Sequence, residues 1–133
     1  MAKEVYQADT QEHGGLFGFG NYNEAYAKYF SGKSYLNPLT NPDETIFMAN
    51  VTFEPGCRNN WHIHHAGQIL VCIEGQEARS LKPGDVVTIL PGVKHWHGAK
   101  IDYWFSHIVI EVPGKDTSSE WCIVVSEEEY GRI

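Results

Sequence analysis

The chain has 133 residues with 17 acidic and 10 basic side chains, which gives a formal net charge of −7. This length suits one domain that buries roughly two thirds of its unfolded surface, and the acidic balance argues against nucleic acid as a partner, because phosphate binding needs a basic face. No apolar run is long enough to cross a membrane, and the N-terminus MAKEVYQADT lacks the apolar stretch of a signal peptide, so we expect a cytoplasmic protein with no membrane partner.

The N-terminal part of the chain predicts an arm and a short helix. Glycines alternate with apolar side chains over residues 14–20, and these side chains are expected to dock on the main domain or on a second subunit. Residues 23–30 have helical spacing, with Asn21 or Asn23 as the N-cap and Gly32 as the terminator. A short helix is therefore expected before the first strand.

The rest of the chain predicts short strands separated by turns, because apolar and β-branched runs alternate with Pro, Gly, Asn and Asp. The predicted strands span residues 34–36, 46–53, 68–73, 86–90, 103–112 and 121–125, and Ser126 with the acidic residues after it predicts a capped helical turn. The odd positions of the fifth strand, Tyr103, Phe105, His107, Val109 and Glu111, share one face.

Five of the seven histidines lie in the middle of the chain. His62 and His64 are two residues apart, so in an extended strand their imidazoles leave the same face, and Gln68 follows with the same parity. His95 and His97 repeat the spacing after a Pro-Gly turn. Two separate strands can thus bring these side chains to one site that is open to solution.

This spacing favours metal coordination. Imidazole nitrogen and amide oxygen are ligands for divalent Mn, Fe, Co, Ni, Cu or Zn, and three or four protein ligands leave positions open for water or substrate. A single histidine in a strand is more often a residue satisfied by a hydrogen bond than a ligand. Two His-x-His pairs with matched parity make the metal site the better interpretation.

Single reactive side chains elsewhere carry less information. Cys57, Cys72 and Cys122 have no metal-ligand spacing and cannot all pair, so reduced thiols are expected. His65 has the opposite parity to the ligand pair and is expected to point away from the site. His13 has no evident partner in the sequence.

Two segments resemble the motifs of the cupin family. The first motif is matched by Gly56-x5-His62-x-His64-x3-Gln68-x6-Gly75, and the second by Gly84-Asp85 followed by Pro91-Gly92-Val93-Lys94-His95. Cupins usually end the ligand set of the first motif with Glu, where this chain has Gln68. Over residues 45–130 the sequence resembles small single-domain cupins of the cupin_2 type, among them carboxymuconolactone-decarboxylase-like cupins and manganese-dependent cupins with hydroxynitrile lyase activity.

The resemblance implies an all-β fold, a double-stranded β-helix or jelly-roll barrel, over residues 36–130, with residues 1–35 as the N-terminal arm and short helix. It places the metal on His62, His64, Gln68 and His95, and it favours manganese over iron, nickel or zinc. It also implies a homodimer, because cupins of this type exchange or pack N-terminal segments across a dimer.

The charge of the predicted ligand shell indicates the chemistry. Neutral imidazoles and a neutral amide leave a divalent ion with its full charge, which suits it to hold and polarise a carbonyl, an enolate or cyanide. His97 and His107 are the predicted catalytic residues, because an imidazole can shuttle a proton near neutral pH. A structural role for His97, in which it only orients a ligand, is the alternative.

We therefore expect a metal-dependent enzyme that acts on a small carbonyl-containing substrate by lyase or decarboxylase-like chemistry. A metal-dependent dioxygenase is one alternative. A non-catalytic small-molecule sensor or binding module is another, because one fold hosts many activities. The sequence does not name the substrate.

Overall fold

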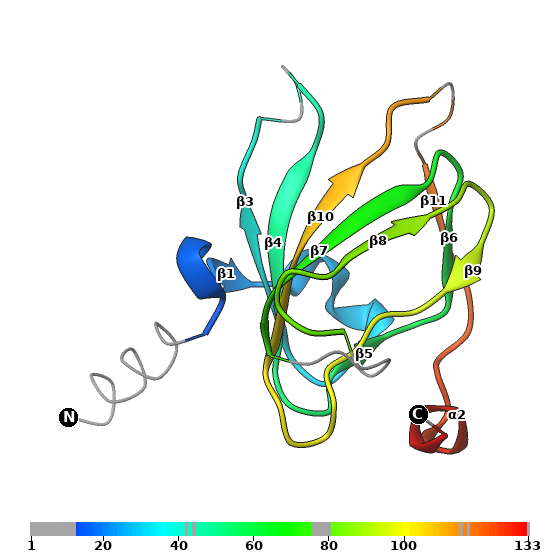
Figure 1. Ribbon diagram of the computed structural model, residues 1–133. Coiled ribbons are helices and arrows are strands. Elements are labelled where there is room, and N and C mark those ends of the chain that lie inside the picture. The colour runs from blue at the N-terminus through cyan, green and yellow to red at the C-terminus, as the bar shows by residue number, and fades with distance from the viewer. Residues whose placement is uncertain are drawn as a thin grey trace.

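Two antiparallel sheets enclose the interior of the computed structural model, which describes residues 13–41, 43, 45–75, 81–114, 116 and 118–132 (Figure 1). The larger sheet has six strands in the order β1-β3-β4-β10-β7-β8, and the smaller has three in the order β11-β6-β9. A short pair, β2 and β5, stands beside them. All neighbouring strands run antiparallel, and the predicted all-β jelly-roll architecture is confirmed.

The strands are short, as the turn residues predict. The larger sheet contains β1 (Asn21–Tyr22), β3 (Ser34–Pro38), β4 (Met48–Phe53), β10 (Phe105–Glu111), β7 (Gln68–Gly75) and β8 (Val86–Ile89). The smaller sheet contains β11 (Ser119–Trp121), β6 (His62–His64) and β9 (Lys94–His95), and the pair consists of β2 (Phe30–Ser31) and β5 (Arg58–Asn59). The helical elements are η1 (Gly15–Phe17), η2 (Glu24–Tyr29) and α2 (Glu127–Gly131).

Alternation along β7 shows how the sequence selects the inward face. Gln68, Leu70 and Cys72 are buried, while the residues between them are half-buried, because successive side chains of a strand leave opposite faces. The parity that places Gln68 on the inward face is therefore confirmed. Leu70 and Cys72 continue that face into the apolar core.

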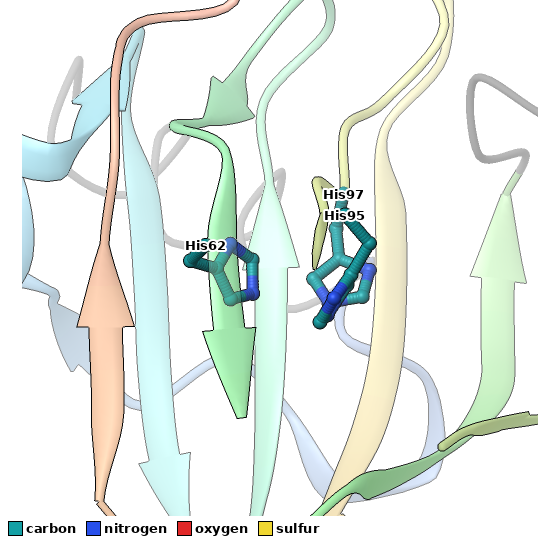
Figure 2. A group of neighbouring side chains, drawn as sticks. All are labelled: His62, His95 and His97. Atoms are coloured by element: carbon teal, nitrogen blue, oxygen red, sulfur yellow. The ribbon is translucent and has the colours of Figure 1, made fainter. Parts of the chain in front are cut away.

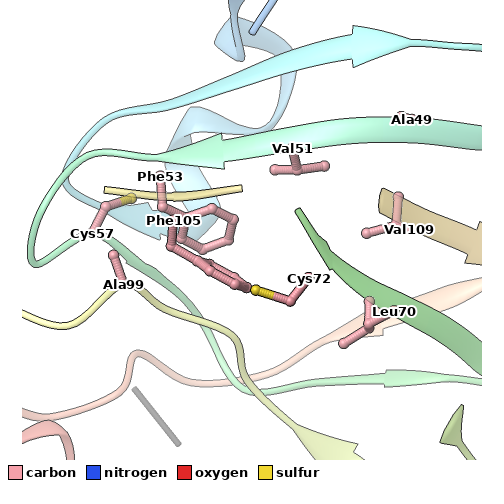
Figure 3. Close-up of a cluster of buried hydrophobic side chains, with 9 residues drawn as sticks. All are labelled: Ala49, Val51, Phe53, Cys57, Leu70, Cys72, Ala99, Phe105 and Val109. Carbon is pink, nitrogen blue, oxygen red and sulfur yellow. The ribbon is translucent and has the colours of Figure 1, made fainter. Parts of the chain in front are cut away.

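The core lies between the sheets and consists of a tight cluster of apolar side chains (Figure 3). Its buried members are Ala49, Val51, Phe53, Cys57, Leu70, Cys72, Ala99, Phe105 and Val109. Phe53 and Phe105 are fully buried, and their rings meet edge to face with centroids 5.8 Å apart. Such pairs contribute beyond their buried area, so these two rings strengthen the packing between β4 and β10 and both contact His107.

The helix predicted over residues 23–30 is a 3-10 helix, η2, rather than an α-helix. Asn23 precedes it, but its side chain makes no cap hydrogen bond. The Asn23 Nδ2 group donates instead to Ser34 Oγ at 3.2 Å. The aromatic rings of η2 turn toward β11, where Tyr29 stacks on Trp121 with centroids 4.4 Å apart. Packing against Trp121, rather than a local cap hydrogen bond, therefore holds η2 in place.

The last predicted strand is displaced. We expected residues 121–125, whereas β11 spans Ser119–Trp121 and pairs with β6. Backbone hydrogen bonds from Cys122 to Trp61 and from Trp61 to Ile123 follow directly after β11, and Ile123 and Val124 are 68% and 57% exposed. The capped turn after Ser126 is confirmed, because Ser126 and Glu129 form a reciprocal capping box at the start of α2.

The described part of the N-terminal arm packs on the larger sheet. Phe19 is buried and lies edge-on to Tyr35 with ring centroids 4.4 Å apart. Asn50 Nδ2 donates to the Gly14 and Gly18 carbonyls at 2.7 and 2.8 Å. The sequence predicted that the arm docks on the main domain or on a second subunit, and the described part of the arm docks on the main domain.

His13 has a partner that the sequence did not reveal. Its Nδ1 atom lies 2.9 Å from Glu74 Oε1, and its ring stacks on Trp104 with centroids 4.1 Å apart. Glu74 lies 61 residues away in the chain, which is why no local pattern predicts the contact. Among the described residues, no helix is long and apolar enough to span a membrane.

Candidate metal centre

Two strands of the smaller sheet bring the predicted histidines together. His62 and His64 lie on β6, which pairs with β9 so that His62 stands opposite His95. The ring centroids of His62 and His95 are 4.2 Å apart, and His97 lies 4.8 Å from His95. In Figure 2, His62 faces His95 and His97 across the site. The ligand atoms of these three residues all lie within 4.8 Å of one another, so this group could hold a metal ion.

The backbone around the cluster is fixed by hydrogen bonds. The turn before β9 has Gly92 at φ 80°, a left-handed conformation that favours glycine, and its N–H donates to the His64 carbonyl at 3.0 Å. Asn59 holds His97 from both sides, because its N–H donates to the His97 carbonyl and its Oδ1 accepts from the His97 N–H at 2.8 Å. The main chain on both sides of His95 is thereby tied to β5 and β6.

Hydrogen bonds select the tautomer of two of these rings. His62 Nδ1 lies 2.8 Å from the Asn60 carbonyl oxygen, and His95 Nδ1 lies 2.9 Å from the Val93 carbonyl oxygen. A carbonyl only accepts, so Nδ1 must carry the proton in both rings. In a neutral imidazole the lone pair is then on Nε2, which is the arrangement found in most metal-binding histidines.

The pKa values of His62 and His64 on β6 are low enough to keep both imidazoles neutral. Burial lowers the pKa of His62 to about 2, with further lowering by the nearby His97 and His95. Burial and His95 lower the pKa of His64 to about 4. Both rings are therefore in the deprotonated, ligand-competent form at neutral pH.

His64 provides the test of whether a metal fits. Its Nδ1 atom lies 3.0 Å from Ser119 Oγ and 3.6 Å from Glu111 Oε2. Its Nε2 atom is buried, and no described residue hydrogen-bonds it. A buried nitrogen without a partner costs about 1–3 kcal/mol, and a metal ion would satisfy it. The donor set of imidazole nitrogens with one amide oxygen also suits a divalent transition ion.

Gln68 connects the cluster to the half-buried carboxyl group of Glu111. Its Nε2 donates to Glu111 Oε1 at 3.4 Å, and its Oε1 lies 3.2 Å from His97 Nε2. Burial raises the pKa of Glu111, and the hydrogen bond from Gln68 opposes that rise. His107 is almost fully buried, and its ring centroid lies 5.2 Å from that of His97. A chain of polar side chains thus runs from β10 to the imidazole cluster.

The cluster opens into a cavity of about 420 Å³, which is within the range of small-molecule sites. Its polar lining residues are Asn23, Asn59, His62, His64, Gln68, His97, His107 and Ser119. Its apolar lining residues are Tyr26, Phe30, Leu36, Val51, Phe53, Val109 and Trp121. The cavity therefore suits a small molecule that has both a polar group and an apolar body.

The structure brings all the predicted site residues together, but the three histidines with mutually close ligand atoms are not the three predicted as metal ligands. His97, predicted as a catalytic residue, lies among the three histidines whose ligand atoms are mutually close, whereas the predicted ligand His64 does not belong to that group of three. Tyr103, predicted to share one strand face with His107, is 47% exposed and precedes β10.

Residues near both ends of the chain line the cavity, which the sequence did not predict. Tyr26 and Phe30, from the segment predicted as a short helix, line the cavity, as do Ser119 and Trp121 near the C-terminus. The His62 and Trp121 ring centroids are 4.7 Å apart. Parity along one strand cannot detect such contacts, because they join segments far apart in the sequence.

Comparisons with solved structures define the class. No family model matches the chain. A cupin-like protein from Thermotoga maritima superposes with a TM-score of 0.78 at 35% identity, over 88% of this chain and 95% of that one. The polyketide cyclase RemF from Streptomyces resistomycificus shares the fold alone, with a TM-score of 0.57 and 14% identity over 84% and 80% of the two chains. The protein belongs to the cupin family.

Within that family, one curated relative has a named activity. The chain is 37% identical over 116 residues to (R)-mandelonitrile lyase from Granulicella tundricola. The match covers 80% of this chain and 88% of the relative. It therefore includes the histidine cluster and most of both sheets.

Proposed function

We propose that this protein is a metal-dependent lyase that cleaves a carbon–carbon bond in a small aromatic hydroxynitrile or a similar carbonyl adduct. The observation that carries the proposal is the neutral, Nδ1-protonated imidazole of His62, which lines a cavity with aromatic side chains and stands next to the Nδ1-protonated ring of His95 at a centroid distance of 4.2 Å. The activity named for the Granulicella relative supports the reaction class.

His62, His64, Gln68 and His95 are the residues we assign to the metal, and the resemblance favours manganese over iron, nickel or zinc. The ion would supply Lewis-acid chemistry, with its double positive charge left uncompensated by neutral ligands. Those ligands come from β6, β7 and β9, so the two sheets together hold the site.

His97 is assigned to proton transfer because of its hydrogen bond. Its Nε2 faces the Gln68 amide oxygen, which only accepts, so this nitrogen carries a proton while Gln68 keeps this orientation. His107 lies behind it, with ring centroids 5.2 Å apart. Two adjacent imidazoles that do not need to bind the ion are suited to take up and return one proton.

The reaction balances with these groups. The hydroxyl proton of the hydroxynitrile passes to an imidazole of the His97–His107 pair, and the oxygen electron pair forms the carbonyl as the bond to the nitrile carbon breaks. Cyanide leaves with that bonding pair and receives the proton from the imidazole. The products are an aldehyde and hydrogen cyanide, and no oxidant is consumed.

The apolar wall supports an aromatic substrate. Tyr26, Phe30, Phe53 and Trp121 line the cavity, and aromatic rings pack favourably edge to face. A phenyl ring that packs on them would lie close to the histidines, because the ring of Trp121 is 4.7 Å from that of His62.

The test combines a substrate with metal analysis. Protein loaded with Mn²⁺ should release benzaldehyde from racemic mandelonitrile equally under air and under argon. His97→Ala and His107→Ala should keep the metal and lose about 10²- to 10⁴-fold in rate, the usual contribution of a general acid–base, whereas His95→Ala should lose the metal.

Three results would count against the proposal. Full activity in both the His97 and His107 variants would remove their catalytic role. Equal metal loss in all three variants would show that the ligand set is misassigned. A strict oxygen requirement would point to a dioxygenase instead.

We also propose a homodimer, as the resemblance implies. Leu16 is 91% exposed and Phe17 is 42% exposed on the docked arm, and burial of both by a second copy would stabilise an assembly. Light scattering that gave a 15.0 kDa particle would contradict this.

A further inference from the structure

We infer that Glu111 is a positioning residue that sets the amide orientation of Gln68 and the ring orientation of His64 for metal binding. The inference rests on the metal site of the proposed function. Glu111 lies at the end of β10, outside the ligand set, and it contacts two members of that set.

The amide of Gln68 has two ends with opposite chemistry. Only its oxygen can bind a cation, whereas its NH₂ group presents positive hydrogens. Glu111 Oε1 accepts from the Gln68 NH₂ group at 3.4 Å, which turns the amide oxygen toward His97 Nε2 at 3.2 Å. A carboxylate only accepts hydrogen bonds, so it selects this orientation over the flipped one.

The second carboxylate oxygen acts on His64. Glu111 Oε2 lies 3.6 Å from His64 Nδ1, and Ser119 Oγ lies 3.0 Å from the same nitrogen. A negative charge beside Nδ1 favours the tautomer with the proton there, which leaves the lone pair on the buried Nε2. One side chain therefore prepares a nitrogen ligand and an oxygen ligand together.

A purely structural role for Glu111 does not explain its position. Its side chain is 24% exposed and lies at a strand end, so the carboxylate has access to water. It is nevertheless directed to Gln68 and His64, which it contacts at 3.4 and 3.6 Å.

The experiment measures metal binding without substrate. Metal-free protein is titrated with Mn²⁺ in competition with a fluorescent chelator, and the visible spectrum of the Co²⁺-loaded protein reports the ligand geometry. Glu111→Leu should lower the Mn²⁺ affinity about 10- to 100-fold, as loss of an outer partner of a metal ligand typically does, and should change the Co²⁺ spectrum.

Two further variants separate the causes. Glu111→Gln keeps an acceptor oxygen for the Gln68 NH₂ group but removes the charge beside His64, so its affinity should lie between that of the original protein and that of Glu111→Leu. Glu120→Leu removes a carboxylate that is 61% exposed and lies on the neighbouring β11, and it should leave affinity and spectrum unchanged. Thermal unfolding of each metal-free variant checks the fold, and Glu111→Ala replaces Glu111→Leu if the latter does not fold.

The outcomes are distinct from a failure of the proposed function. If the original protein binds no Mn²⁺ or Co²⁺, the metal site itself is wrong. If it binds metal and Glu111→Leu binds equally well with the same spectrum, only the role of Glu111 is overturned. An equal loss in Glu111→Gln and Glu111→Leu would show that charge acts alone, and it would overturn the amide-orienting role.

Discussion

Phe53 and Phe105 offer a matched pair that separates stability from ligand binding. Both side chains are fully buried in the same core cluster (Figure 3). Phe53 lines the 420 Å³ cavity, whereas Phe105 is not among its described lining residues. Replacing each by leucine keeps an apolar side chain and removes the ring. If the account is right, both variants lose stability and only one loses affinity for an aromatic ligand.

The stability losses follow from the ring contacts. Phe105 meets Phe53 and His107 at centroid distances of 5.8 and 4.8 Å. At about 0.5–1.5 kcal/mol for each aromatic contact, Phe105→Leu should cost about 1–3 kcal/mol. Phe53 contacts Phe105, His107 and Phe30 at 5.8, 5.5 and 5.6 Å. It has one aromatic contact more than Phe105, so Phe53→Leu should cost about 0.5–1.5 kcal/mol more.

Urea unfolding of the metal-free protein measures these losses, and calorimetric titration of the loaded protein with benzaldehyde measures affinity. Phe53→Leu should weaken benzaldehyde binding severalfold, whereas Phe105→Leu should leave it nearly unchanged. The reasoning is refuted if Phe105→Leu weakens binding as much as Phe53→Leu, because the wall of the cavity would then not be the one described.

The remaining predictions concern the thiols and the C-terminal helix. Burial raises the pKa of Cys57 to about 12, and Cys72 is 2% exposed. Both thiols should therefore resist Ellman's reagent in the folded protein at pH 8, while the more exposed Cys122 reacts. Three fast-reacting thiols would contradict this. Ser126→Ala removes the capping box of α2 and should lower the free energy of unfolding by about 1 kcal/mol, measured by urea titration. Ser118→Ala, which changes an exposed loop hydrogen bond, is the control, and an equal effect of the two would count against the cap.

The strand-borne part of the site could be predicted from the sequence because it depends on local periodicity. His62 and His64 share a face by parity, and Gln68 begins the next strand on the inward side. The Pro-Gly turn before His95 is likewise a local signal. These features require only the two-residue repeat of a strand and the dihedral freedom of glycine.

The parts that sequence reasoning missed depend on contacts between distant segments. Trp121 stacks on Tyr29 across 92 positions of the chain and lines the cavity. β11 pairs with the short strand β6 and ends at Trp121, although the apolar run continues to Val125. The aromatic rings of η2 also pack on Trp121. Periodicity within one segment contains none of this information.

The metal content of the protein tests the central claim most directly. Protein purified without a chelator should contain about one divalent transition ion per chain by elemental analysis, and chelation followed by added Mn²⁺ should restore one ion per chain in the original protein but not in His95→Ala. Metal-free protein that takes up none of manganese, iron, nickel or zinc would contradict the assignment of His62, His64, Gln68 and His95.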